Sequence, residues 1–496
     1  MNPYLELETI FRRVHRVGEA MAVLHWDMAA MMPAGGAAAR GEQLATLMGI
    51  RHDMLTAPRN GELLAAAAAL TDLSPWQAAN LQEMQREYIH ATCVPRDLVE
   101  EVSRRGSECE VVWRQARKDN DFARLTPYLQ EVLRLVRKIA VVKGEALGVS
   151  PYDGLLDQYE PGGSSERIDV IFDDLAAFLP GFLEAVLDHQ DTLPEPLSLA
   201  GLYPVEKQKA LATRLMEAWG FDFQHGRLDT SHHPFCGGYP DDVRLTTFYD
   251  EKNFFKGMMG VLHETGHALY ERGLPVEWRA LPVGQARGMS MHESQSLFVE
   301  MQISRSPAFA RWAAPLYREA FGGSGPAWEA ENINRVASRV ERGLIRVDAD
   351  EVTYPAHVIL RYRLEKAMIA RDLEIPELPE AWNAGMQELV GITPPDDRDG
   401  CMQDIHWMDG AFGYFPTYTL GAMTAAQLRA GAERDLGDLD ELVARGEFQP
   451  ILGWLVDKVH SKGAAFSNDD ILTEATGATL DASFFKDHLK RRYLPS

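Results

Sequence analysis

Apolar residues recur at helical spacing through most of the first 220 residues, and this pattern constrains the fold more than any other feature of the sequence. Residues that start helices stand between the apolar segments. In Ser74-Pro75-Trp76-Gln77, serine caps a helix, proline takes its first turn and glutamine completes a capping box. The pattern predicts a mainly α-helical protein, with helices near residues 7–24, 37–55, 97–119, 127–146, 166–182 and 205–219.

A different pattern occupies residues 227–249. β-branched and aromatic side chains gather at 227–230 and 243–249, on either side of the glycine-rich run 237–240. Short strands around a turn have this composition. We expect a small antiparallel β-sheet here, followed by a return to helices that begins at 253–271.

Composition excludes several classes of partner. Fifty Lys and Arg residues against 73 Asp and Glu give a formal net charge of −23. This charge repels nucleic acid and anionic membranes, so we expect neither as a partner. The four cysteines (Cys93, Cys109, Cys236 and Cys401) form no Cys-x-x-Cys pair, and the first residues lack the pattern of a signal peptide. We therefore expect a cytoplasmic protein.

The strongest chemical signal is the run from His263 to His267, His-Glu-Thr-Gly-His, which apolar residues flank on both sides. Positions i and i+4 of a helix share one face, so both imidazoles can reach one ion with Glu264 beside it. Zinc suits this arrangement, because its catalytic sites keep one position for water. Glu264 would take the proton from that water as it attacks a carbonyl group. The alternative is a chance meeting of core histidines, but their burial without a metal would be costly.

A third protein ligand must come from elsewhere in the chain. The metzincin spacing requires a histidine at position 273, which is a glycine, so that class is excluded. Glu271 continues the same helical face but lies further along the helix. It is better suited to accept a hydrogen bond from an imidazole than to bind the metal itself. Glu293 begins a second predicted helix, but it could instead form a capping box with Ser290. Spacing alone leaves both roles open, and it also leaves open whether His292 supports the site or simply starts a helix.

The chain resembles the carboxypeptidase Taq family of zinc metallocarboxypeptidases over nearly its whole length. The six ordered motifs that carry this resemblance are His233-Pro234-Phe235, Asp242-Val-Arg244-Leu-Thr246, the run from His263 to His267, His292-Glu293-Ser294-Gln295, Ile345-Arg346-Val-Asp-Ala349-Asp350 and Gly400-Cys-Met-Gln403-Asp404-Ile-His406-Trp407.

The resemblance implies a mainly α-helical, thermolysin-like (gluzincin) zinc peptidase with a small antiparallel sheet beside a deep active-site groove. It implies a homodimer that removes single amino acids from peptide C-termini with broad specificity. His263, His267 and Glu293 would be the metal ligands and Glu264 the general base. The expected metal is zinc, with cobalt as a possible substitute.

An enzyme that acts only at free C-termini needs a cation for the terminal carboxylate. The planar guanidinium of arginine matches a carboxylate, and Arg346 lies in a motif similar to that of the family. The alternative is a helix-surface arginine paired with Asp348 or Asp350. We predict that Arg346 binds the substrate carboxylate.

Hydrolysis also needs hydrogen-bond donors for the oxyanion. His406 and Tyr418 are suitable, with Tyr414 as a rival for the role of the phenol. Trp407 is expected to be a core residue. We expect His233, Asp242 and Arg244 to have structural roles.

No long linker or internal repeat interrupts the chain. We expect one metallocarboxypeptidase domain over residues 1–496, with a helical scaffold at 1–225, a catalytic core at 226–425 and C-terminal helices at 426–496. Two alternatives are a zinc oligopeptidase that releases larger fragments and a non-catalytic module stabilised by metal.

Overall fold

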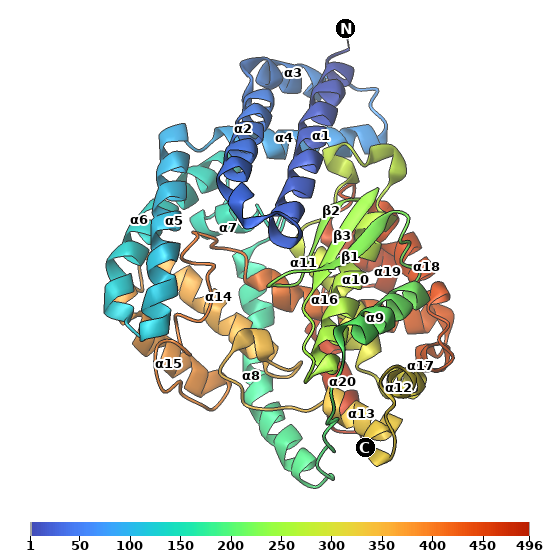
Figure 1. Ribbon diagram of the computed structural model, residues 1–496. Coiled ribbons are helices and arrows are strands. Elements are labelled where there is room, and N and C mark those ends of the chain that lie inside the picture. The colour runs from blue at the N-terminus through green and yellow to red at the C-terminus, as the bar shows by residue number, and fades with distance from the viewer. Residues whose placement is uncertain (1, 496) are drawn as a thin grey trace. The chain divides into compact units, whose positions relative to one another are not determined.

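The computed structural model describes residues 2–495, which are mainly helical as predicted (Figure 1). The chain divides into two compact units, and each is assembled from three segments of the sequence. Unit 1 contains the segment up to residue 91, residues 195–338 and residues 421–480. Unit 2 contains residues 92–194, 339–420 and the segment from 481 onwards. The single domain expected from the sequence stays a prediction.

Unit 1 holds the sheet and most of the shorter helices. Its α-helices are α1 (Pro3–Ala30), α2 (Ala37–Thr56), α3 (Pro58–Ala68), α4 (Pro75–Thr92), α9 (Val205–Trp219), α10 (Phe254–Gly273), α11 (Met289–Leu297), α12 (Pro307–Phe321), α13 (Ala330–Ala337), most of α16 (Pro416–Leu436), α17 (Leu439–Ala444), α18 (Gln449–Lys458) and α19 (Asn468–Thr476). A π-helix, η4 (Phe298–Ser304), continues α11, and 3-10 turns lie at η1 (Ala34–Gly36), η2 (Val276–Trp278), η3 (Pro282–Gly284), η5 (Pro326–Trp328) and η8 (His460–Lys462).

Unit 2 is built from helices joined by irregular loops. They are α5 (Arg96–Asp119), α6 (Phe122–Leu147), α7 (Pro151–Leu156), α8 (Ser165–Asp191), α14 (Tyr354–Ala370), α15 (Leu378–Leu389) and α20 (Ala482–Tyr493), with 3-10 turns at η6 (Arg346–Asp348) and η7 (Ile375–Glu377).

The helices predicted from local sequence patterns are confirmed, since each predicted range falls within α1, α2, α5, α6, α8 or α9. The capping box at the start of α4 is also present. The amide of Gln77 donates to Ser74 Oγ at 3.3 Å, and the amide of Ser74 donates to Gln77 Oε1 at 3.0 Å. Local signals sufficed here because capping involves residues only three apart.

The predicted sheet is present, but its expected pairing and turn are partly wrong. Its three strands, β1 (Gly226–Thr230), β2 (Phe235–Tyr239) and β3 (Asp242–Thr247), have the order β1-β3-β2. The hairpin β2–β3 is antiparallel, whereas β1 pairs with β3 in parallel because the chain reverses direction between β1 and β2. Gly237 and Gly238 lie inside β2 rather than in a turn. A Cβ at Gly238 would stand 2.1 Å from the carbonyl oxygen of Asp242, so glycine permits the close approach of β3.

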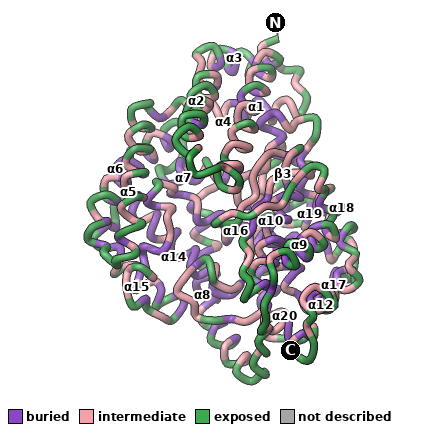
Figure 2. Tube along the Cα trace, viewed as in Figure 1, coloured by how far each residue is buried: buried purple, intermediate pink, exposed green. Residues whose placement is uncertain are grey.

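The core of unit 1 surrounds α10, which is buried along most of its length (Figure 2). Aromatic residues from α9, α10 and α12 fill this core, among them Trp219, Phe254 and Tyr317. A helix buried in this way is held rigidly, which suits it to carry a site that needs fixed geometry.

None of the described helices combines the length and apolar character that crossing a membrane requires.

Candidate metal centre

Helix α10 carries the two histidines of the predicted site. Its start is fixed by Asn253, whose side-chain oxygen accepts a hydrogen bond from the amide of Lys256 at 3.3 Å. His263 and His267 lie one turn apart, and their ring centroids are 5.0 Å apart. The helical spacing therefore places both imidazoles on the same face.

Two glycines allow Glu293 of α11 to approach these rings. A Cβ at Gly266 would stand 2.3 Å from the carbonyl oxygen of Gln295, so α10 and α11 pack in direct backbone contact. On the other side of Glu293, a Cβ at Gly421 of α16 would stand 2.8 Å from Glu293 Cβ. Larger residues at either position would displace the carboxylate or the helix that carries it.

The three predicted ligand residues converge on one position. Candidate ligand atoms of His263, His267 and Glu293 all lie within 4.8 Å of one another. Glu293 Oε2 is 3.4 Å from His267 Nε2 and 3.8 Å from His263 Nε2. A tetrahedral ion with bonds of about 2.1 Å separates its ligand atoms by about 3.4 Å. The residues present therefore fit a small divalent cation.

The outer nitrogen of His263 is held by a buried carboxylate. His263 Nδ1 lies 3.0 Å from Glu300 Oε2, and the other oxygen of Glu300 accepts a hydrogen bond from Arg305 Nη2 at 2.7 Å. Glu300 lies on the π-helix η4, directly after α11. A carboxylate behind a ligating histidine fixes the ring so that Nε2 faces the ion.

A second histidine holds His267. The Nδ1 atoms of His267 and His292 are 2.6 Å apart, and His292 Nε2 lies 2.8 Å from Glu271 Oε1. If His267 binds an ion through Nε2, its Nδ1–H donates to His292, whose Nε2–H donates to Glu271. His292 therefore holds the His267 ring from behind, and Glu271 accepts a hydrogen bond from an imidazole outside the proposed ligand set, as its position on the helix suggested.

The charges of the centre are strongly coupled. Burial opposes the charge on His263, but Glu293 and Glu300 outweigh it and raise the pKa of His263 to about 10. Burial lowers the pKa of His267 to about 4. Although burial favours a neutral carboxyl group, His263 and His267 lower the pKa of Glu293 to about 2. The metal-free centre therefore holds its proton on His263 at neutral pH.

Glu264 has the environment of a general base. Its side chain is buried, and burial raises the pKa of Glu264 to about 7, against the opposing charge of His263. A carboxyl group with a pKa near neutrality can both accept and return a proton at that pH.

The capping alternative for Glu293 is wrong. Helix α11 is preceded by Gly288, and no described side chain caps its first turn. The Glu293 carboxylate instead faces the two imidazoles and accepts a hydrogen bond from Ser296 Oγ at 3.2 Å. Sequence reasoning missed Glu300, although its spacing of two helical turns from Glu293 could have indicated a shared face.

The other three predicted site residues lie in unit 2. Arg346 is 6% exposed, and its Nε and Nη2 donate to Asp404 Oδ1 at 3.1 and 2.8 Å. Its Nη1 donates to the hydroxyl of Tyr354 at 3.0 Å. The alternative of a surface arginine paired with Asp348 or Asp350 is therefore wrong.

His406 and Tyr418 lie together in unit 2. The hydroxyl of Tyr418 is 3.4 Å from His406 Nε2, and burial lowers the pKa of His406 to about 4, so the ring is neutral. Among the described residues, no group bonds to the buried Nδ1 of His406. Tyr414 is also close, with its ring centroid 5.8 Å from that of His406. The geometry thus keeps both tyrosines within reach of the histidine.

The segment that carries His406 is fastened to α14 by a buried carboxylate. Glu365 accepts hydrogen bonds from Trp407 Nε1 at 2.9 Å, from the hydroxyl of Tyr152 at 2.8 Å and from the amide of Gly413 at 3.1 Å. Trp407 is 3% exposed, so its prediction as a core residue is confirmed.

The sheet residues of the resemblance have structural contacts. Arg244 forms an ion pair with Asp242 at 2.6 Å and stacks 4.4 Å above the ring of Trp26. Arg227 packs against the same ring at 4.8 Å. His233 is exposed and its carbonyl accepts a hydrogen bond from Ser231. These contacts agree with structural roles for the three residues.

Comparison with known proteins defines the class. The family model of the carboxypeptidase Taq (M32) metallopeptidases matches residues 6–493. The chain belongs to this family of metallocarboxypeptidases, which favours the carboxypeptidase prediction over the oligopeptidase and non-catalytic alternatives.

Relatives match the chain over almost its full length. The chain is 39% identical to thermostable carboxypeptidase 1 of Thermus thermophilus, over 95% of this chain and 94% of the relative. It is 35% identical to carboxypeptidase 1 of Bacillus subtilis, over 98% and 97%. The solved structure of Trypanosoma cruzi metallocarboxypeptidase 1 has a TM-score of 0.98 and 42% identity, and the match covers 99% of both chains.

Proposed function

We propose that the chain removes single amino acids from peptide C-termini at a zinc centre held by His263, His267 and Glu293. The observation that supports this most directly is the convergence of the two Nε2 atoms and Glu293 Oε2, while other side chains hold both Nδ1 atoms from behind. Two helices that supply His-Glu-x-x-His and a later glutamate define a thermolysin-like arrangement, which we propose for this fold. Cobalt has a similar preference for these ligands and is a possible substitute.

When bound, the metal would supply a Lewis acid that activates water and polarises the scissile carbonyl. Glu264 would accept the proton from the attacking water and return it to the leaving amine, as its pKa near neutrality allows. His406 and Tyr418 would donate hydrogen bonds to the oxyanion, with Tyr414 as the alternative phenol.

Arg346 would bind the substrate carboxylate in this proposal. Its Nε and Nη2 remain with Asp404, so the substrate would compete with the Tyr354 hydroxyl for Nη1. Asp404 would keep the guanidinium of Arg346 oriented before the peptide arrives. A homodimer and a cytoplasmic location complete the proposal, and both rest on the family resemblance and on composition.

Replacement of Glu264 by glutamine tests the proposal. The neutral amide of the Glu264→Gln variant cannot accept the proton, so release of C-terminal residues should fall by about 10²- to 10⁴-fold with unchanged metal content. Mass spectra of digested peptides should show ladders that shorten by one residue in the parent protein. A folded, metal-loaded Glu264→Gln variant with parental activity would contradict the role of this residue.

A further inference from the structure

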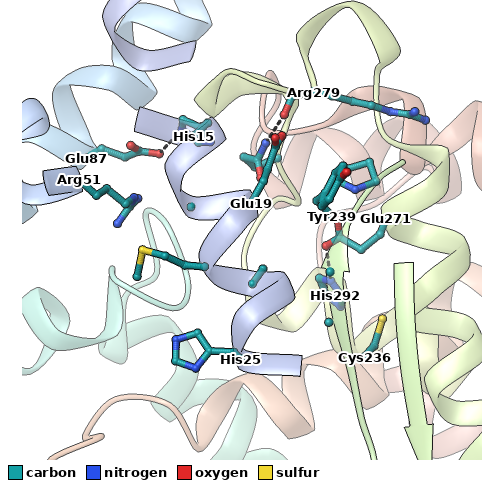
Figure 3. Close-up of a pocket in the computed structure, with 17 residues that line it drawn as sticks. His15, Glu19, His25, Arg51, Glu87, Cys236, Tyr239, Glu271, Arg279 and His292 are labelled. Carbon is teal, nitrogen blue, oxygen red and sulfur yellow. Dashed lines mark hydrogen bonds and ion pairs between the residues drawn. The ribbon is translucent and has the colours of Figure 1, made fainter. Parts of the chain in front are cut away.

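A pocket of about 560 Å³ lies in unit 1 (Figure 3). Helix α1 lines one side with His15, Glu19 and His25, and residues 236–240 of β2 and the following turn line another. Glu271 and His292 also line it. Because His292 is hydrogen-bonded to His267, the wall of the pocket is one residue away from a proposed metal ligand.

Strand β2 gives this pocket a surface for an extended peptide. It is an edge strand, since the order β1-β3-β2 pairs it only with β3 among the described strands. Edge strands offer backbone groups to an added peptide strand, and α1, which also contacts β2, forms the facing wall of the pocket. Gly237 and Gly238 carry no side chains that would cover this backbone. A carboxypeptidase substrate has one residue after the cleaved bond, so the rest of the peptide must lie on the upstream side.

Two acidic side chains dominate the charge of the pocket. Among the charged lining residues, Arg279 donates to Asp241 and to the carbonyls of Leu274 and Arg272, so its charge is already compensated. The charges of Arg51 and Glu87 offset each other. Glu19 and Glu271 are the two acidic lining residues whose charges are not offset by a charged residue of the pocket wall in this way.

These two carboxylates are only weakly compensated. Glu19 lies 2.7 Å from the guanidinium of Arg16, whose side chain is 63% exposed, and an ion pair to such an exposed partner contributes little. Glu271 receives a hydrogen bond from a ring nitrogen of His292 through one oxygen. A cationic group in the pocket could therefore form an ion pair with either acid.

We propose that this pocket is a subsite for the upstream part of the peptide and that Glu19 and Glu271 select a cationic group there. The inference rests on the proposed function, because it assumes cleavage at the His263–His267–Glu293 centre. Glu271 lies four residues beyond His267, which is about 6 Å of helix rise. An extended peptide advances about 3.3 Å per residue. If the upstream peptide follows α10 from His267 towards Glu271, the cation belongs to the second or third residue before the cleaved bond.

Acetylated pentapeptides with lysine, norleucine or glutamate at the second or third residue before the cleaved bond test this inference. The metal-loaded, full-length enzyme should cleave the lysine peptides about 3- to 10-fold better than the norleucine peptides, mainly through KM, and the glutamate peptides least well. Shorter peptides with a free or an acetylated amino terminus distinguish the two sources of a cation. A gain only with the free amine would assign the subsite to the peptide's N-terminus.

Glu19→Gln should bring the ratio of lysine to norleucine cleavage closer to one, with Glu271 left as the only proposed selecting carboxylate. Glu8→Gln is the matched control, because Glu8 lies on α1 with Arg12 as partner and does not line the pocket. This control should keep the parental ratio. Equal cleavage of lysine and norleucine peptides by the parent enzyme, or a parental ratio in Glu19→Gln, would overturn the inference. Full activity of the Glu264→Gln variant would instead overturn the proposed function.

Discussion

Gly266 of α10 lies so close to α11 that a Cβ on this residue would stand 2.3 Å from the carbonyl oxygen of Gln295. The glycine inside the histidine motif therefore sets the distance between the helix with two proposed ligands and the helix with the third. Position 266 is one of the two variable positions of that motif, yet here the helix contact restricts it to glycine. The geometry of the proposed metal centre depends on a backbone contact as well as on the proposed ligands.

Gly266→Ala should weaken metal binding and stability together. The methyl group must push α11 away. Overpacking of this kind lowers the free energy of unfolding by about 1–3 kcal/mol. Movement of Glu293 should lower zinc affinity by about tenfold or more, as loss of ligand geometry does. Chemical denaturation and competition with a chelator would measure the two effects.

Gly260→Ala is the matched control for this prediction. Gly260 lies on the same helix, but no described atom outside its own helical turns stands within 4 Å of a Cβ placed there. Alanine is a better helix former than glycine, so this variant should gain up to about 1 kcal/mol and keep its metal affinity. Equal loss of metal from both variants would mean that helix propensity, rather than the contact with α11, explains the effect.

His292→Ala should lower zinc affinity about 10- to 100-fold, because the His267 ring loses the partner of its Nδ1. His292 is not itself a proposed ligand, so the ligand set remains complete. His225→Ala is a suitable control, since His225 is exposed and pairs with Asp222 at a turn outside the metal centre. Zinc affinity measured with a competing chelator should change in the first variant alone. Unchanged affinity in His292→Ala would contradict a supporting role.

Local patterns predicted the helices and the two histidines because the interactions behind them span only a few residues. The capping box at Ser74 and the shared face of His263 and His267 are of this kind. The parallel pairing of β1 with β3 could not be read in the same way, since strand order depends on contacts outside each strand.

Partners distant in the sequence were the hardest to predict. Asp348 and Asp350 are the acidic residues close to Arg346 in the sequence. Arg346 nevertheless pairs with Asp404, which lies 58 residues away. Burial decided this outcome, because a guanidinium in the interior needs a carboxylate that folding brings to it. Glu300 was missed for a related reason: its partner His263 lies 37 residues away in the sequence.

Metal binding should depend steeply on pH. In the metal-free protein, Glu293 and Glu300 outweigh burial and raise the pKa of His263 to about 10. The ion must displace this proton, so apparent affinity should increase about tenfold for each pH unit between about 7 and 9. Titration in buffers of different ionisation enthalpy should detect release of about one proton per ion. Affinity that is independent of pH over this range would contradict a protonated His263 in the metal-free centre.

The carboxylate of Glu351 should protect unit 2 against unfolding at neutral pH. It is 4% exposed and accepts hydrogen bonds from His488 Nε2 at 2.7 Å and from Arg492 Nη1 at 2.9 Å, both on α20. Burial opposes its charge, but Arg492 and His488 lower the pKa of Glu351 to about 2. Glu351→Gln leaves the buried guanidinium of Arg492 without a charge to bind, and we expect a loss of about 2–4 kcal/mol at pH 7.

The sign of the pH dependence follows from the lowered pKa of Glu351. Because the folded protein holds this carboxyl group ionised more strongly than the unfolded chain does, its contribution is complete above the unfolded pKa of about 4.5. The contribution decreases as the pH falls from about 4.5 towards 2. The difference in unfolding free energy between parent and Glu351→Gln should therefore shrink over this window, as urea denaturation at each pH would measure.

Glu374→Gln is a control, because its ion pair with Arg137 involves a carboxylate that is 50% exposed. A constant difference between parent and Glu351→Gln from pH 7 to pH 2.5 would mean that packing, and not the charge of Glu351, holds α20 in place.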